Sequence, residues 1–432
     1  MGILEHVSSE PERCIRVHHA EPLEGEVLVP GAKNSVLKLM AASLLAEGTF
    51  EITNVPGIAD VGIMAELLRA IGVTVTETPD YGVVTIVNGG NLTPIAPLEL
   101  VDRIRASINV LGPLLTRCGE VTIAMPGGDD FGSRPIDMHI AGLEAMGAHF
   151  EFDGGTVIAR AERLHGAEIT FDFPSVGATE NIVTAAVLAD GITIIHNAAR
   201  EPEIIDLCEY LNEMGARVGG AGTSTLRIEG VERGTLHGCE HETVPDRIQA
   251  ATYIAACAVT GGRLDLLNAQ SKHMEMVLSR LGDMGMEIDQ LPYGMRVAAP
   301  ERLRSADVAT LPYPGIATDY KPLIITMLTV ADGVGVVTEN LYPGRFAYVE
   351  ELQRLGADIK TDGHHALIRG VDHLVGTSVV AHDIRAGAAM VVAGLAAEGT
   401  TTITGVHHID RGYDDLVGRL RSVGAEIERV GC

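Results

Sequence analysis

The apolar positions of this chain follow one pattern that returns along almost its whole length. Apolar residues at helical spacing lead into a glycine, and a β-branched run follows, as in residues 66–75. A second pattern lies between these copies and consists of small apolar residues, a glycine and another β-branched run. The first pattern occurs at 66–75, 142–148, 210–216, 281–285, 352–356 and 420–424, and the glycines of the second are Gly48, Gly119, Gly191, Gly262, Gly333 and Gly399. The repetition predicts a helix–strand–helix–strand unit of about 70 residues, copied six times.

The two predicted helices of each unit differ in polarity. Residues 181–189 and 388–397 are apolar on nearly every face, which is typical of a buried helix. Residues 349–355 alternate charged residues with leucine at helical spacing, so one face of that helix is expected to meet water. The strands, such as 400–404, are β-branched. We therefore predict an α/β (α+β) architecture in which the helices lie inside and the sheets outside.

Length and composition indicate how the six units are grouped. The chain has 432 residues, which is too long for one ordinary core. Hydrophobic residues make up 46% of it, so a large buried core can form. Six units divide naturally into two domains of three, which gives a two-domain inside-out α/β barrel. No linker rich in proline or serine separates the halves, which favours two close crossings between the domains and a cleft there. Clefts of this kind commonly bind ligands.

Charge and cysteine usage exclude several classes of protein. The net charge of −26 argues against a nucleic-acid partner, because binding to phosphate backbones needs a surplus of lysine and arginine. No apolar run approaches the length of about 20 residues that a membrane span needs, and residues 1–10 do not resemble a secretory signal. We therefore expect a cytoplasmic protein without a membrane partner. The six cysteines form no Cys-x-x-Cys pair, and we expect reduced thiols. The sequence predicts no oligomeric state.

Several cationic residues occur only once and are not needed by the repeat. Lys33 stands at the start of a predicted helix, where a cation opposes the helix dipole. It is either a solvated side chain or a cation directed, with the helix N-terminus, at an anion. The arginines at the unit junctions would each be solvated if taken alone, but together they would form a phosphate or carboxylate site. These arginines include Arg105, Arg134, Arg345, Arg385 and Arg411.

Two segments of the chain carry aspartates that are candidates for an acid or base in catalysis. Residues 126–135 are rich in glycine and contain Asp129 and Asp130, so they form either a polar turn or a lid that carries an acid or base over a substrate. Asp319 follows a turn at 314–318 and is either a helix N-cap or a general base. The residues alone thus predict a two-domain enzyme for small anionic molecules.

These single residues lie, in order, within long motifs that resemble the enolpyruvyl transferase family. The resemblance extends from about Val17 to Val430. The motifs are GAKN at 31–34, RAS at 105–107, LGP at 111–113, PGG at 126–128, SVGAT at 175–179, AAREPE at 198–203, PDRI at 245–248, TD at 318–319, DIRA at 383–386 and HIDRGY at 408–413. The resemblance implies a first domain at 33–244, which carries the lid loop, and a second domain made of 1–32 and 245–432. The active site would lie in the cleft between them.

The same resemblance implies a reaction. The enolpyruvyl group of phosphoenolpyruvate would pass to the 3-hydroxyl of UDP-N-acetylglucosamine, with release of phosphate, by addition and elimination. This is the first committed step of peptidoglycan synthesis, and in this family it needs no metal and no organic cofactor.

Residue roles are implied one position at a time. Lys33, Arg134 and Arg411 would bind the phosphate and carboxylate of phosphoenolpyruvate. Asp319 would take the proton of the 3-hydroxyl. Asp129 would act as the general acid. Substrate contacts are implied for Asn34, Arg105, Arg134, Pro135, Ile136, Asp137, Ser175, Val176, Gly177, Tyr342, Arg345 and Arg385.

One departure from the family pattern concerns the lid. Asp129 stands directly after Pro-Gly-Gly, where the family usually has cysteine. A carboxyl group there can still donate a proton if a closed lid raises its pKa, but it is not a thiol that an epoxide alkylates. We therefore expect resistance to fosfomycin. Covalent labelling of Asp129 with inactivation at a low dose of the drug would contradict this.

A second departure concerns the sugar side of the site. The chain has Ile316 and Ala317 before Thr318-Asp319, where the family usually has Phe-Pro, and it has 342–344 as Tyr-Pro-Gly before Arg345. The uridine side is unaltered, so two alternatives stay open. One is an enzyme of nucleoside-antibiotic synthesis that transfers enolpyruvate to the 3′-hydroxyl of UMP or a related nucleotide. The other is a non-catalytic regulator that binds uridine nucleotides.

Overall fold

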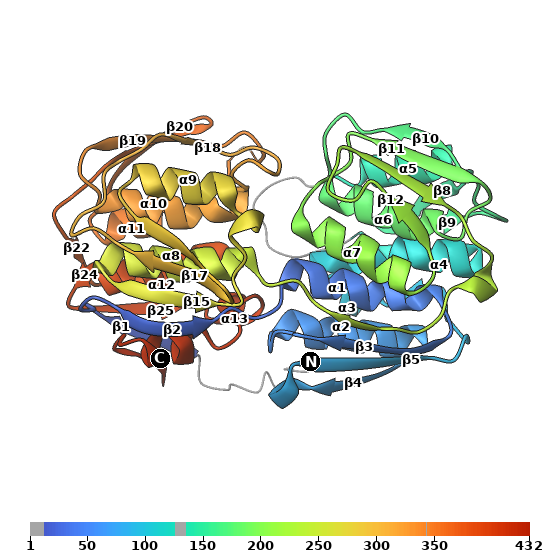
Figure 1. The fold of residues 1–432 in the computed structure, drawn as a ribbon, viewed down its shortest axis with the longest axis horizontal. Helices are drawn as coiled ribbons and strands as arrows, with labels where there is room; N and C mark the ends of the chain where they lie inside the picture. Colours follow the sequence, from blue (N-terminus) through green and yellow to red (C-terminus); the bar gives the residue numbers. More distant parts are fainter. Residues whose placement is uncertain (1–12, 126–134, 343) are drawn as a thin grey trace, which may run out of the picture.

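Two separate hydrophobic cores organise the molecule. The computed structural model describes residues 13–125, 135–342 and 344–432. One core is built from residues between Val36 and Leu236, and we call this part the continuous lobe. The other joins residues 15–29 to 248–427, and we call it the split lobe. In Figure 1 the lobes lie side by side, and the blue strands β1 (Arg13–His18) and β2 (Glu24–Leu28) belong to the yellow-to-red lobe.

The strands of both lobes are short and follow the chain in groups. The continuous lobe contains β3 (Gly48–Thr53), β4 (Thr74–Thr78), β5 (Val83–Asn88), β6 (Ile95–Ala96), β7 (Glu120–Ala124), β8 (His149–Asp153), β9 (Thr156–Arg160), β10 (Glu168–Thr170), β11 (Ile192–His196), β12 (Arg217–Gly219), β13 (Thr225–Glu229) and β14 (Glu240–Glu242). Besides β1 and β2, the split lobe contains β15 (Arg263–Leu267), β16 (Glu287–Leu291), β17 (Gly294–Ala298), β18 (Val308–Ala309), β19 (Val334–Thr338), β20 (Asp358–Asp362), β21 (His365–Arg369), β22 (Leu374–Val375), β23 (Ser378–Val380), β24 (Ala397–Glu398), β25 (Thr400–Thr404) and β26 (Ile427–Gly431).

One sheet topology is repeated six times among the described residues. In the sheet β6-β7-β9-β8, β6 is parallel to β7, and β9 is antiparallel to both β7 and β8. The same pattern recurs in β14-β3-β5-β4, β10-β11-β13-β12, β2-β15-β17-β16, β18-β19-β21-β20 and β23-β25-β1-β26. The strands β22 and β24 add a two-stranded sheet. The prediction of six copied units is therefore confirmed, although β1, β2 and β14 reach their sheets from distant parts of the chain.

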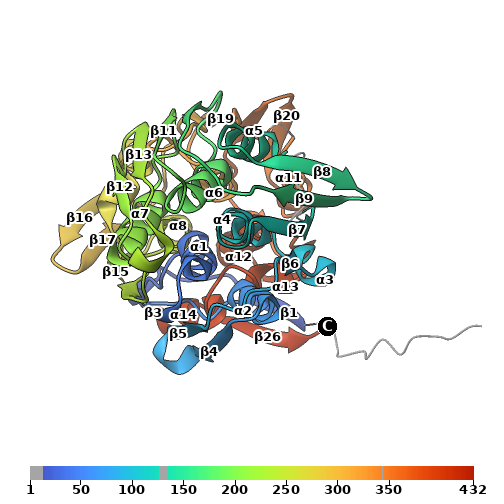
Figure 2. The same cartoon turned by 90° about the vertical axis from the view of Figure 1, so that its right-hand side faces the viewer.

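The apolar helices lie in the interior, as their sequences predict. In the split lobe α8 (Arg247–Thr260), α10 (Lys321–Thr329) and α12 (Ile384–Ala396) pack against one another and are buried almost throughout. Figure 2 shows the sheets of the continuous lobe around α1 (Lys33–Ala42), α4 (Leu111–Cys118) and α6 (Val176–Ala186). The other helices are α2 (Ala59–Ile71), α3 (Leu98–Val101), α5 (Asp137–Ala145), α7 (Pro202–Glu213), α9 (Glu275–Asp283), α11 (Val349–Arg354), α13 (His407–Asp410) and α14 (Leu416–Ser422). No helix in the described parts of the chain is long and apolar enough to cross a membrane.

The chain passes between the lobes at two adjacent segments. Gly31 forms an antiparallel bridge with Pro245. The Ala32 amide donates to the Val244 carbonyl at 2.7 Å, and the Asp246 amide donates to the Pro30 carbonyl at 2.8 Å. These bonds place the start of α1 beside the start of α8, so residues at both helix N-termini meet where the lobes join.

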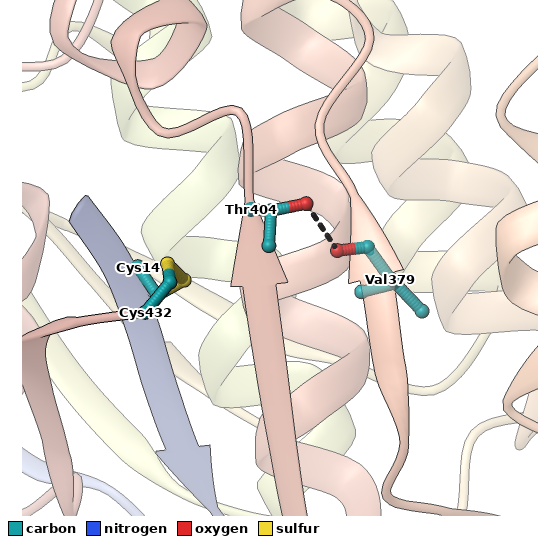
Figure 3. Close-up of a disulfide and its surroundings, with 4 residues drawn as sticks. All are labelled: Cys14, Val379, Thr404 and Cys432. Carbon is teal, nitrogen blue, oxygen red and sulfur yellow. Dashed lines mark hydrogen bonds between the residues drawn. A yellow bond between two sulfur atoms is a disulfide. The ribbon is translucent and has the colours of Figure 1, made fainter. Parts of the chain in front are cut away.

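The expectation that all six cysteines are reduced is wrong for one pair. Cys14 on β1 and Cys432 form a disulfide, with their Cα atoms 5.6 Å apart, and Figure 3 shows it beside Thr404 of β25. The two cysteines meet because β1 pairs with β26 in the sheet that closes the split lobe. Cys118, Cys208, Cys239 and Cys257 are free thiols.

The disulfide predicts a redox-dependent stability. It joins residues 418 positions apart, and such a crosslink stabilises a fold by about 2–4 kcal/mol, mainly by restricting the unfolded chain. We expect a thiol reductant to lower the midpoint of urea unfolding of the wild type, and Cys432→Ser to lower it equally. The reductant should have no further effect on Cys432→Ser, and an unchanged wild-type midpoint would contradict the prediction.

Candidate active site between the lobes

One group of charged residues joins the two lobes directly. Lys33, the first residue of α1, lies with its Nζ 2.8 Å from Oδ2 of Asp60. Arg411, which follows α13 in the split lobe, donates its Nε to Oδ1 of the same aspartate at 2.9 Å. Asp60 lies in the first turn of α2 and is 1% exposed. A carboxylate of the continuous lobe thus holds two cations, one from each lobe.

The surroundings of Lys33 lower the pKa of its ammonium group. Burial lowers the pKa of Lys33, the charge of Asp60 opposes this change, and the positive charges of Arg385 and Arg411 lower the pKa further. The influence of Arg385 also shows that the Lys33 group adjoins a second group of charges. An anion that binds here would contact several cations. Because these side chains are largely buried, their interactions with its charge would be strong.

The second group is centred on Asp319. This residue lies in a short 3₁₀-helix, residues 318–320, just before α10. Its Oδ1 accepts from Nη1 of Arg345 at 2.9 Å and its Oδ2 accepts from Nε of Arg385 at 3.2 Å. The side chains of both arginines are 4% exposed, whereas that of Asp319 is 25% exposed. The carboxylate is therefore reached from solvent while its partners are covered.

Asp319 is held in its ionised form. Burial alone would raise the pKa of Asp319, but the charges of Arg345 and Arg385 and their hydrogen bonds outweigh it and hold the pKa well below its usual range. The structure does not use this side chain as a helix cap, which was one of the two readings of the sequence. The adjacent helix starts are capped by other carboxylates: Asp246 accepts from Lys33, Ile248 and Gln249 amides, and Asp383 accepts from Arg385 and Ala386 amides.

A third group lies within the continuous lobe, around the start of α6. Ser175 caps this helix by accepting from the Ala178 amide at 3.3 Å. His139 of α5 is 5% exposed, and neither ring nitrogen has a hydrogen-bond partner among the described residues. A Cβ atom on Gly177 would lie 2.9 Å from Nε2 of His139, so only glycine leaves this imidazole undisturbed.

The third group also contains a histidine with a shifted pKa. Burial lowers the pKa of His139 to about 4, helped by the charge of Arg105 and opposed by Asp137. The imidazole is therefore neutral near pH 7, so one ring nitrogen can donate a hydrogen bond and the other can accept one. A buried polar side chain without a partner needs an explanation, and a bound ligand is one.

The sequence-predicted residues fall into four groups by position. Lys33, Arg411, Asp319, Arg345 and Arg385 come together where the lobes meet. The residues placed in the continuous lobe are Asn34, which is half-buried on α1, together with Arg105, Pro135, Ile136, Asp137, Ser175, Val176 and Gly177. Tyr342 lies three residues before Arg345 and donates its amide to Glu339 at 3.1 Å. Asp129, Arg134 and most of the predicted lid loop lie outside the described residues.

Sequence reasoning missed several residues of the site. Asp60 was missed because an acidic residue in the first turn of a helix is ordinary. His139 closes the motif that contains Arg134, Pro135 and Asp137, but no role was assigned to it, because the sequence does not show that its ring is buried without a partner among the described residues. The AAREPE and PDRI motifs were recognised, but their ion pair was not: Arg247 of α8 donates Nε to Glu203 of α7 at 3.0 Å, which is a second buried link between the lobes.

Known proteins match this chain over almost its whole length. A family model described as EPSP synthase (3-phosphoshikimate 1-carboxyvinyltransferase) matches residues 17–420. The UDP-N-acetylglucosamine 1-carboxyvinyltransferase of Nocardia farcinica is 53% identical over 413 residues, which cover 95% of this chain and 96% of the relative. The protein of that name from Mycobacterium tuberculosis is 52% identical over 410 residues, covering 95% and 97%.

Solved structures agree on the fold. The enolpyruvyl transferase NikO from Streptomyces tendae has a TM-score of 0.87 at 24% identity and covers 98% of this chain and 100% of its own. An EPSP synthase from Acinetobacter baumannii has a TM-score of 0.73 at 20% identity, covering 97% and 100%. These identities support the fold alone, whereas the curated relatives share about half of all residues. The chain therefore belongs to the enolpyruvyl transferase family.

Proposed function

We propose that this protein transfers the enolpyruvyl group of phosphoenolpyruvate to the 3-hydroxyl of UDP-N-acetylglucosamine and releases phosphate, the reaction that begins peptidoglycan synthesis. Relatives that carry this activity in their names align over almost the full chain. The observation that carries the proposal is the meeting of Lys33 and Arg411, one from each lobe, near Arg385, which in turn holds the partly exposed carboxylate of Asp319.

The cations have a direct role in binding phosphoenolpyruvate. Its phosphate and carboxylate are anions of the kind that Lys33 and Arg411 already hold in Asp60. When the substrate binds, these two side chains exchange part of their bonding to Asp60 for bonding to the substrate. The same cations stabilise the negative charge that grows on the phosphate as its bond to carbon breaks.

Asp319 accepts the proton of the attacking hydroxyl. In the addition step C3 of the enolpyruvyl group gains a proton, C2 becomes electrophilic, and the sugar oxygen bonds to C2 while its proton passes to Asp319. In the elimination step C3 loses a proton and the bond from C2 to the phosphate oxygen breaks, which restores the double bond and releases phosphate. A carboxylate with so low a pKa is a weak base, so the proton moves as the new C–O bond forms, when the hydroxyl has become acidic.

The remaining roles follow the same proposal. The group at the start of α6, with Arg105, Asp137 and Ser175–Gly177, holds the uridine and its phosphates, and Asn34 contacts the sugar. Arg134 joins the phosphoenolpyruvate cations and Asp129 supplies the proton to C3. The two catalytic domains are 33–244, and 1–32 with 245–432, in keeping with the two cores. We place the reaction in the cytoplasm.

The test is phosphate release from phosphoenolpyruvate with each acceptor, combined with mass analysis of the product. The proposal predicts release with UDP-N-acetylglucosamine and a product heavier by one enolpyruvyl group. Release with UMP but not with UDP-N-acetylglucosamine would instead favour a nucleotide-modifying enzyme, and Ile316 and Ala317 would then be the altered acceptor contacts. Release with neither acceptor, together with tight nucleotide binding, would favour a regulator.

A further inference from the structure

A fully buried carboxylate lies behind the Asp319–Arg345 pair. Glu339 follows β19 and its side chain is 0% exposed, as is that of Lys321, whose Nζ lies 2.8 Å from Oε2 of Glu339. The same Oε2 accepts from the Thr318 hydroxyl at 2.7 Å. The other oxygen, Oε1, accepts from the Thr310 hydroxyl at 2.7 Å and from the Leu341 and Tyr342 amides at 2.8 and 3.1 Å. Five donors therefore converge on one carboxylate.

The environment keeps Glu339 ionised. Burial alone would raise the pKa of Glu339, but the Lys321 ammonium and the hydrogen bonds from Lys321, Thr310 and Thr318 outweigh it and lower the pKa to about 2. Lys321 also donates to the Arg345 carbonyl and lies with its Nζ 4.0 Å from the centre of the Phe346 ring. The ion pair is thus bonded to both chain segments that carry Asp319 and Arg345.

We propose that Glu339 is a positioning residue for the transfer reaction: through the Thr318 hydroxyl and the turn at 341–342, it fixes Arg345 against Asp319. This inference rests on the proposed function. Glu339 does not touch the reacting atoms, and its effect passes through its neighbours.

The Thr318 hydroxyl is the central link. A hydroxyl has one proton, and donation of that proton to Glu339 turns its lone pairs toward other donors. Nη1 of Arg345 uses this by donating to Oγ1 of Thr318 at 3.1 Å and to Oδ1 of Asp319 at 2.9 Å. In Glu339→Gln the amide oxygen is needed by the Leu341 and Tyr342 amides, so the NH2 group faces the Thr318 hydroxyl. The hydroxyl then loses its fixed acceptor, and its contact with Arg345 is weakened.

The turn after Glu339 supplies a second link. Oε1 of Glu339 holds the amides of Leu341 and Tyr342, and the Arg345 amide donates to the Tyr342 carbonyl at 3.2 Å. The backbone of Arg345 is thereby held at both ends, since Lys321 bonds its carbonyl. A guanidinium on so well-fixed a backbone loses little freedom when it pairs with Asp319.

Two substitutions test the inference. Glu339→Gln keeps the shape and removes the charge, and Thr318→Val keeps the ion pair and removes only the linking hydroxyl. In both we expect kcat to fall about 10- to 100-fold with the KM for UDP-N-acetylglucosamine within about threefold, because orientation of the base matters more than binding. The acid limb of the kcat profile should also move to higher pH, since Arg345 holds the pKa of Asp319 down.

Glu351→Gln is the matched control. Glu351 is another buried carboxylate of the split lobe, and it accepts from the Val380 amide at 3.0 Å. We expect Glu351→Gln to lower thermal stability and to leave kcat per active site and its pH profile unchanged. Wild-type kcat and pH profile in Thr318→Val would overturn the inference, whatever Glu339→Gln does to stability.

Failure of the inference and failure of the proposed function are distinguishable. If the wild type releases no phosphate with UDP-N-acetylglucosamine or UMP, the proposed function fails. A crystal structure of Thr318→Val then decides the positioning claim. A longer separation than 2.9 Å between Nη1 of Arg345 and Oδ1 of Asp319 supports it, and an unchanged separation overturns it.

Discussion

Replacing Asp319 with asparagine is expected to lower kcat about 10³-fold, because the amide cannot take a proton from the acceptor hydroxyl. The substitution keeps the shape of the side chain, and its oxygen can still accept from Arg345 or Arg385. Binding should therefore suffer less than turnover, and the KM for the nucleotide sugar should change much less than kcat. The measurement is the initial rate of phosphate release with both substrates saturating. A variant that keeps more than about a tenth of wild-type kcat would contradict the assignment of Asp319 as the base.

Asp265→Asn is the control for this experiment. Asp265 on β15 also accepts two hydrogen bonds from an arginine, both at 2.6 Å from Arg296, but this pair lies on an outer sheet. We expect its kcat to stay within about twofold of wild type, since surface ion pairs contribute little.

Stability should respond to pH in a defined direction. Asp319 has a folded-state pKa below the value of about 3.9 expected in an unfolded chain. Its ion pairs therefore stabilise the fold above about pH 4, and the stabilisation is lost as pH falls through the folded-state pKa. The gap in unfolding midpoint between wild type and Asp319→Asn should narrow accordingly in acid.

Replacing Lys33 with methionine is expected to lower kcat/KM for phosphoenolpyruvate about 10²- to 10³-fold. Methionine occupies a similar volume but carries no charge. Of the two cations that are described beside Asp60, only Arg411 then remains. Because the pKa of Lys33 is lowered, Lys33 should lose its proton at a lower pH than an ordinary lysine. Wild-type kcat/KM for phosphoenolpyruvate should therefore begin to decline at a lower pH than an ordinary lysine would give. The variant should lack this decline. Equal kcat/KM values for the two proteins would rule out a substrate-binding role for Lys33.

Lys38→Met offers a closely matched control. Lys38 lies on the same helix, its side chain is 11% exposed like that of Lys33, and its Nζ lies 3.0 Å from Oε1 of Glu180. It thus reproduces the burial and ion pairing of Lys33 without contacting Asp60 or Arg411. We expect this variant to lose stability and to keep kcat/KM for phosphoenolpyruvate within about threefold of wild type.

The six-unit fold could be predicted from the sequence because its signals are local. The buried helices are apolar on nearly every face apart from a few charged residues, and the outer helices have one face in water. These patterns do not depend on what is distant in the chain. The predicted position of Lys33 at the start of a helix holds for the same reason. The place of the N-terminal strand was harder to predict, because β1 completes the last sheet by pairing with β25 and β26 from the opposite end of the sequence.

The partners within the site could not be predicted in the same way. Asp60 and Arg411 are 351 residues apart, and only the docking of the lobes brings them together. Glu339 is an ordinary acid after a strand until Lys321 is known to lie beside it. A lysine at the start of the apolar helix α10 was the one available signal of that buried pair. The disulfide likewise depends on β1 and β26 being neighbours.

The most direct test of the account is a crystal structure of Asp319→Asn with phosphoenolpyruvate and UDP-N-acetylglucosamine bound, since this variant should hold both substrates unreacted. We predict the anionic groups of phosphoenolpyruvate within hydrogen-bond distance of Lys33 and Arg411, and the sugar 3-hydroxyl beside residue 319. Substrates bound elsewhere, with the Lys33–Asp60–Arg411 contacts unchanged, would contradict the claim that the two lobes build one site for enolpyruvyl transfer.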